Sequence, residues 1–154
     1  MESHELKSVK KDVLRYCSYR ERTSGEVLEY LKKFRLNPVD EGKLMCELIE
    51  NDVINDFRFA KMYVSGKFRV NGWGRDKIAY RLKAMGLSDT LIKLALEEID
   101  EEDYTSLAKK FIEKKRLDLR NSKSSAEINK KIFNYLKSKG FESDLISHLL
   151  KVSD

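Results

Sequence analysis

The residues of this chain best suited to chemistry are cations placed around a single tryptophan. The segment Lys67-Phe68-Arg69-Val70-Asn71-Gly72-Trp73-Gly74-Arg75-Asp76-Lys77 interleaves basic side chains with aromatic rings and two glycines. Cations bind phosphates or carboxylates, and an aromatic ring stacks on a nucleobase or carries a cation over its face. The segment therefore predicts contact with phosphates, with a nucleobase or with an acidic protein groove.

Two further features extend this basic surface. Lys77, Tyr80 and Arg81 are spaced to share one flank of a helix. A later expected helix carries three lysines away from its apolar face, where binding and solubility explain them equally well. Trp73 is also suited to packing one helix against its neighbour. The candidate contact residues are Lys67, Arg69, Trp73, Arg75, Lys77, Arg81, Lys130, Lys131 and Lys137.

The sequence gives little support for a catalytic site or a metal site. The two histidines, His4 and His148, have no nearby partners in the sequence, and Cys17 and Cys46 are expected to be reduced core thiols. No zinc spacing, phosphate-binding glycine loop or nucleophile elbow occurs. The acidic run over residues 97–103 lacks the alternating ligands and central glycine of a calcium loop. The sequence predicts a protein that is not an enzyme, with no catalytic residues, metal or cofactor.

Charge is distributed unevenly along the chain, whose formal net charge is +5. Residues 65–85 hold six bases against Asp76 alone, residues 107–139 hold eleven bases against three acids, and the acidic run separates them. Such fields attract polyanions or acidic protein faces. No apolar stretch approaches membrane-spanning length and no leader pattern opens the chain, so we expect a cytoplasmic protein with no membrane partner.

The elements that position these residues follow a repeat. A leucine-lysine pattern occurs at residues 30–36, 81–87 and 135–141, about every 50 residues, which leaves room for three short helices per unit. The predicted fold is all-α, an elongated array of three tandem three-helix units that resemble helix-turn-helix modules. We expect a flexible N-terminus over residues 1–8 and repeats over 9–53, 54–100 and 101–154. Such an array buries its own core, so a monomer is expected.

Several local signals place the helix ends. Thr23 and Glu26 form a capping box, Asn37-Pro38 opens a helix, and Asp56 or its neighbour caps another. We expect the first helix over residues 9–19, a loop that includes Gly66 and residues 72–74, a helix over 104–117 and a polar loop over 118–123. Lys139 replaces a core residue of the other repeats. This substitution either weakens the third core or places a basic side chain at its edge, with its aliphatic stem buried and its ammonium free.

The chain resembles the RecX family of recombination regulators. The resemblance rests on the stretch Leu14–Val27, on Asp56-Phe57-Arg58-Phe59-Ala60, on the basic glycine loop and on the leucine-lysine-glycine helix ends, and it runs from about residue 9 to 150. Two positions depart from the family pattern. Asn55 stands where an acidic pair is usual, and Arg35 ends a helix where glycine is usual, which predicts a different turn there.

The resemblance implies a non-catalytic protein that binds the RecA recombinase and lies in the groove of its DNA filament. It would restrain strand exchange, ATP hydrolysis or filament growth in homologous recombination and DNA repair. Single-stranded or duplex DNA would be a second, weaker partner. No family motif assigns the contact residues, so the candidates rest on charge geometry. The alternative is a free-standing helix-turn-helix DNA-binding protein that acts without RecA.

Overall fold

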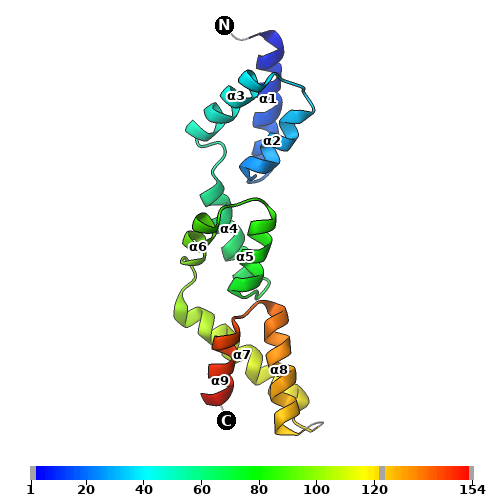
Figure 1. Ribbon diagram of the computed structural model, residues 1–154, viewed down its shortest axis with the longest axis vertical. Helices are drawn as coiled ribbons and strands as arrows, with labels where there is room; N and C mark the ends of the chain where they lie inside the picture. Colours follow the sequence, from blue (N-terminus) through cyan, green and yellow to red (C-terminus); the bar gives the residue numbers. More distant parts are fainter. Residues whose placement is uncertain (1–2, 122–123, 153–154) are drawn as a thin grey trace. The chain divides into compact units, whose positions relative to one another are not determined.

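The computed structural model describes residues 3–121 and 124–152. These residues form nine α-helices and no strand (Figure 1). Backbone packing divides the chain into two compact units, residues 1–60 (unit 1) and 61–154 (unit 2). The helices are α1 (His4–Tyr19), α2 (Ser24–Lys32), α3 (Pro38–Glu50), α4 (Asp56–Arg69), α5 (Arg75–Ala84), α6 (Asp89–Leu96), α7 (Glu101–Leu119), α8 (Ser125–Lys139) and α9 (Ser143–Val152). The predicted all-helical chain of three-helix units is confirmed.

The helices begin where a polar side chain satisfies a free backbone N–H group. Thr23 and Glu26 form the complete capping box predicted for α2, and Asn37 caps α3 with Pro38 at its first position. The oxygen of Asn55 accepts the N–H of Arg58 at 2.9 Å, so Asn55 caps α4. Serine or aspartate caps four further helices, through Ser3, Ser88, Asp100 and Ser124.

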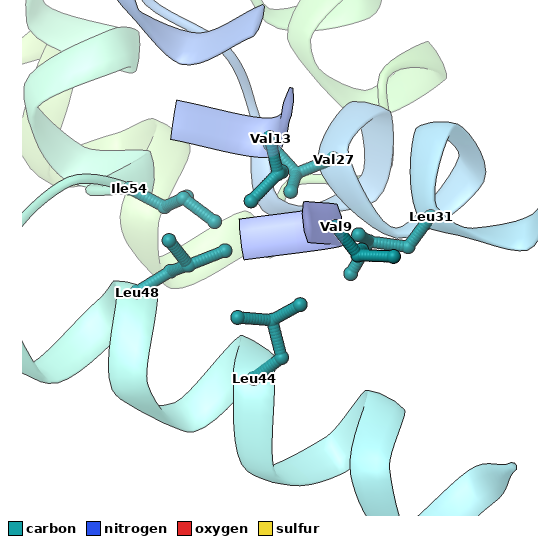
Figure 2. Close-up of a cluster of buried hydrophobic side chains, with 7 residues drawn as sticks. All are labelled: Val9, Val13, Val27, Leu31, Leu44, Leu48 and Ile54. Atoms are coloured by element: carbon teal, nitrogen blue, oxygen red, sulfur yellow. The ribbon is translucent and has the colours of Figure 1, made fainter. Parts of the chain in front are cut away.

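The core of unit 1 is a cluster of aliphatic side chains, shown in Figure 2. It draws on α1, α2, α3 and the segment before α4, and its buried members are Val9, Val13, Val27, Leu31, Leu44, Leu48 and Ile54. The rings of Tyr16 and Tyr30 stack beside it, with centroids 4.0 Å apart. Burial of these side chains supplies most of the driving force for the fold of this unit.

Two apolar residues, Leu14 and Ile49, and one of the two thiols predicted for a core lie outside it. Ile49 and Leu14 are 51% and 48% exposed, and Cys46 is exposed. Leu14 and Ile49 each follow a buried neighbour, and successive residues of an α-helix point about 100° apart, so only one of each pair faces the core. The prediction of two core thiols is therefore wrong for Cys46, while Cys17 packs partly buried against the cluster.

Some predicted helix bounds are wrong. Because Ser3 caps it, α1 starts at His4 rather than at residue 9, and residues 4–8 are helical. Gly66 lies inside α4, not in a loop. With Asp100 as its cap, α7 spans residues 101–119, so the loop predicted over 118–123 begins later, and residues 122–123 lie outside the described part of the chain.

One left-handed residue recurs after the shared leucine of each repeat. Four residues beyond Leu31, Leu82 and Leu136, the backbone takes a left-handed conformation, with φ of 54° at Arg35, 90° at Gly86 and 99° at Gly140. Glycine adopts this conformation without steric cost, and arginine does not. The turn at Arg35 shares this φ region but differs in its hydrogen bonds, as predicted. The N–H groups of Leu87 and Phe141 donate to the carbonyl oxygens of Leu82 and Leu136, whereas no such bond joins Leu36 to Leu31 in the described part of the chain.

In unit 2 the start of α5 lies against the end of α8. The N–H of Gly74 donates to Lys139 O at 2.8 Å, and the N–H of Asp76 donates to Gly140 O at 2.9 Å. A Cβ atom at Gly140 would lie 2.3 Å from the Cβ of Lys77. The bond from Asp76 satisfies an N–H group of the first turn that a capping side chain would otherwise satisfy, because the N-cap Gly74 has no side chain. The end of α8 therefore fixes the first turn of α5, which carries two of the candidate contact residues.

Candidate functional site

Three cations of unit 2 gather over the ring of Trp73. The ring centroid lies 4.8 Å from Lys67 Nζ, 4.5 Å from Lys77 Nζ and 5.4 Å from Arg81 Cζ. Lys67 Nζ also lies 5.4 Å from the ring centroid of Tyr63. These five residues, Tyr63, Lys67, Trp73, Lys77 and Arg81, are called the Trp73 cluster below.

Two helices and the turn between them position the cluster. Tyr63 and Lys67 lie one turn apart on α4, as Lys77 and Arg81 do on α5. The N–H of Trp73 donates to the carbonyl oxygen of Lys67 at 3.0 Å, which closes the turn beneath the ring. Gly72 precedes the tryptophan with a φ of 67°, and a Cβ atom there would lie 2.8 Å from Cζ of Phe111.

The cations of the cluster have no acidic partner within the described part of the chain. No ion pair of Lys67, Lys77 or Arg81 occurs among residues 3–121 and 124–152. The acid nearest in sequence, Asp76, is paired instead with Lys137 Nζ at 3.6 Å. Burial raises the pKa of Tyr63 above its ordinary value although the nearby charge of Arg81 opposes the rise, so its hydroxyl is neutral at physiological pH. Attraction to the two rings partly offsets the mutual repulsion of the three cations.

Arg75, although adjacent in sequence, belongs to a different arrangement. Its guanidinium donates to the carboxylates of Glu142, at 2.9 Å, and Glu101, and lies 3.9 Å from the ring centroid of Tyr104. Burial lowers the pKa of Arg75, but the hydrogen bond to Glu142 and the charges of both carboxylates outweigh it, and the pKa lies above its ordinary value. This arginine holds α5 to α7 and to the segment before α9.

Tyr104 completes this structural network. Its fully buried hydroxyl accepts the N–H of Arg75 at 2.9 Å and donates to the carboxylate of Glu142. Burial and the hydrogen bond to Glu142 raise the pKa of Tyr104 far above its ordinary value, so the hydroxyl keeps its proton and its donor role.

The remaining candidates lie apart from the cluster or are engaged elsewhere. Arg69 is exposed and lines a pocket of about 350 Å³ between α4 and the start of α7, together with Glu98, Asp100 and Asp103. Lys130 and Lys131 are exposed on α8. Lys137 is the partner of Asp76, as described above.

Lys139 differs from its prediction. Its ammonium lies 5.2 Å from the ring centroid of Phe111, and it donates to Asn71 O at 3.0 Å, so it is not free. By this bond α8 restrains the turn that leads to Trp73.

Four residues of the cluster are among the contact residues predicted from sequence, and the fifth, Tyr63, is not. Tyr63 lies four residues before Lys67, and residues at that spacing on a helix are neighbours, so the sequence could have indicated that Tyr63 belongs to the cluster. Sequence spacing does not indicate the ion pairs of Arg75, because Glu101 and Glu142 are distant in sequence and contact the arginine only in the folded unit.

Other kinds of site are not evident in the described residues. Within residues 3–121 and 124–152, no three of the histidine, cysteine, aspartate and glutamate side chains are grouped so as to hold a metal ion. Over the same residues, none of the helices has the length and apolar character needed to span a bilayer.

The fold and the site together define a class: helical proteins built from three-helix, helix-turn-helix-like domains with a cationic surface. Residues 55–96 match the family model for the second three-helix domain of RecX, and residues 101–150 match that for the third. The chain belongs to the RecX family, and its relatives are named as regulatory proteins.

Individual relatives agree with this assignment. The regulatory protein RecX of Bacillus subtilis (strain 168) is 35% identical over 139 residues, which are 87% of this chain and 50% of that protein. RecX of Lactobacillus gasseri is 30% identical, over 90% of this chain and 51% of that protein. The chain thus spans about half the length of the curated relatives that it matches.

A solved structure supports the fold. The crystal structure of RecX from Lactobacillus salivarius superposes with a TM-score of 0.88 and covers 96% of this chain and 95% of that chain. At 24% sequence identity this likeness is evidence for the fold alone.

Proposed function

We propose that this protein binds filaments of the RecA recombinase on DNA and inhibits their ATP hydrolysis and strand exchange. The observation that carries the proposal is the Trp73 cluster, three cations without acidic partners in the described chain, in a member of a family of regulatory proteins. Cations left unpaired on a surface attract an anionic partner, and a DNA filament presents phosphates and acidic protein surface together. The role is non-catalytic, and its site is the cytoplasm, where RecA assembles.

The geometry favours a contact that tightens an existing assembly. The cations stand on α4 and α5, which the turn at Trp73 joins, and their attraction to the Trp73 ring orients them before a partner arrives. Preorganised charges lose little conformational entropy on binding. A bound protein of this kind would hold the filament in one state and thereby slow the cycle of ATP hydrolysis and growth.

The experiment is a titration of the protein into RecA on single-stranded DNA, with ATP hydrolysis and co-sedimentation as readouts. We expect inhibition by the native protein. Replacing the three cations together by glutamine, in K67Q/K77Q/R81Q, should raise the concentration for half-inhibition at least tenfold, because each contact between a cation and a phosphate contributes on the order of 1 kcal/mol. Arg75 is left intact because its ion pairs stabilise the fold.

A matched control removes the same charge elsewhere. The variant K43Q/K93Q/K151Q replaces three exposed lysines on α3, α6 and α9 and should inhibit like the native protein. Circular dichroism checks that both variants stay helical. Absence of inhibition and of co-sedimentation at saturating native protein would contradict the proposal. Equal loss in both triple variants would show that net charge matters and the cluster does not.

A second candidate function is DNA binding without RecA. It is favoured by the match of two segments to three-helix domains named after the helix-turn-helix motif. Binding to bare DNA at physiological salt, with an affinity that RecA does not change, would support this candidate over the first.

A further inference from the structure

We infer that the Trp73 cluster binds the phosphodiester backbone of a nucleic acid, and that the indole ring holds the cations in place and does not stack on a base. The inference rests on the proposed function, because it takes the cluster as the contact surface. It goes further by assigning the chemical group that is recognised and the role of Trp73.

The first argument concerns access to the ring. Trp73 is half-buried, and the ammonium groups of Lys67 and Lys77 lie within 4.8 Å of its centroid. A base stacks at about the contact distance of two carbon atoms, roughly 3.5 Å. A nucleobase could therefore take that place only after displacing a cation and losing its attraction to the ring.

The second argument concerns protein partners. An acidic protein groove would be expected to use the aromatic ring as a buried anchor, since tryptophan, tyrosine and arginine dominate the energy of protein interfaces. The cations over Trp73 leave its ring poorly suited to that role. Contact with a phosphate needs only the charges, and none of the three cations has an acidic partner in the described part of the chain.

The third argument concerns spacing. Lys77 and Arg81 lie one turn apart on α5, about 6 Å along the helix axis, and Lys67 approaches from α4. Charges set at intervals on two elements suit a chain of repeated anionic groups better than a single carboxylate. The same arrangement reads no base edge, so it predicts binding without sequence preference.

The experiment uses the single tryptophan of the chain as its own reporter. Three probes are titrated while Trp73 fluorescence and the affinity are measured: oligothymidylate, an abasic phosphodiester oligomer of equal length, and polyglutamate. We expect the two phosphodiesters to bind within threefold of one another, with the same change in fluorescence. The K67Q/K77Q/R81Q variant should weaken the binding of both phosphodiesters to the same degree.

Each other outcome overturns the inference. Stacking on one base is worth about 5- to 150-fold in affinity, so an abasic oligomer bound at least tenfold more weakly would show that the ring stacks. Polyglutamate bound as tightly as the phosphodiesters would assign the cluster to an acidic protein. If no probe binds, the backbone contact is wrong. The proposed function is then tested separately by the RecA ATP hydrolysis assay, which does not require the protein to bind DNA on its own.

Discussion

Arg35 holds a backbone conformation that an L-residue adopts at a cost. Its φ of 54° lies in the left-handed region, and the equivalent residues of the other repeats are Gly86 and Gly140. The cost of this conformation is about 1 to 2 kcal/mol for a side chain with a Cβ atom. Since the arginine is exposed, it gains little from packing that could offset this cost.

We predict that Arg35→Gly stabilises unit 1. The gain should be about 0.5 to 1 kcal/mol, because relief of backbone strain exceeds the larger entropy that glycine loses on folding. Urea unfolding followed by circular dichroism measures it. Arg35→Ala is the control: it removes the same side chain but keeps the Cβ atom, and should leave stability nearly unchanged. A stabilisation by alanine equal to that by glycine would contradict the explanation.

Trp73 and Arg75 lie close together in one basic segment but have different partners in the structure. Trp73 lies among unpaired cations, while the guanidinium of Arg75 is held by Glu101 and Glu142. Both appear in the same basic segment, and both were candidates for partner contact. The structure indicates that substitution of Arg75 would damage the fold, so loss of binding in such a variant would not identify a contact.

At the scale of elements, the contact between α5 and α8 depends on two glycines. Gly74 and Gly140 let the two backbones meet, and a Cβ atom at Gly74 would lie 2.4 Å from the carbonyl of Gly140. No flexible side chain stands between them that could move aside. The contact sets the position of α5 and hence of Lys77 and Arg81.

We predict unequal costs for alanine at two glycines with the same backbone conformation. Gly86→Ala has open space around its new Cβ atom and should cost about 1 kcal/mol from backbone strain. Gly140→Ala adds a clash with Lys77 and should cost about 3 kcal/mol or more. Thermal unfolding of the two variants measures the difference. Equal destabilisation would show that α8 moves away from α5 without penalty.

At the scale of the whole molecule, charge is the property that matters for binding. A net charge of +5 acts at long range, but only the cations that contact phosphates release counterions. The two contributions separate in the salt dependence of affinity, because counterion release gives a constant slope on a double-logarithmic plot.

We predict a specific change in that slope. For single-stranded DNA each phosphate contact contributes about 0.7, so K67Q/K77Q/R81Q should reduce the slope by about 2. Fluorescence anisotropy between low and physiological salt measures it. The control variant K43Q/K93Q/K151Q changes net charge equally and should keep the native slope. A slope that falls equally in both variants would contradict a localised contact.

The repeat, the helical class and most helix starts could be predicted from sequence, because they depend on local interactions. Thr23 with Glu26 and Asn37 with Pro38 form their caps within a few residues, and the leucines at 31, 82 and 136 mark one face of a helix by spacing alone. The exposure of Leu14 and Ile49 could not be predicted in this way. Both are apolar beside a buried residue, and which of two neighbours is covered depends on the helix that packs against them.

The same division holds for the site. The sequence by itself determined that Lys67, Trp73, Lys77 and Arg81 lie close together, since the spacing of residues along a helix and across a short turn is set by backbone geometry. Only the tertiary structure decided which cations remain unpaired. Asp76 forms an ion pair with Lys137, and Arg75 forms ion pairs with Glu101 and Glu142. The physical reason is that an ion pair needs its atoms within a few ångströms, and for residues far apart in the chain only folding brings them there.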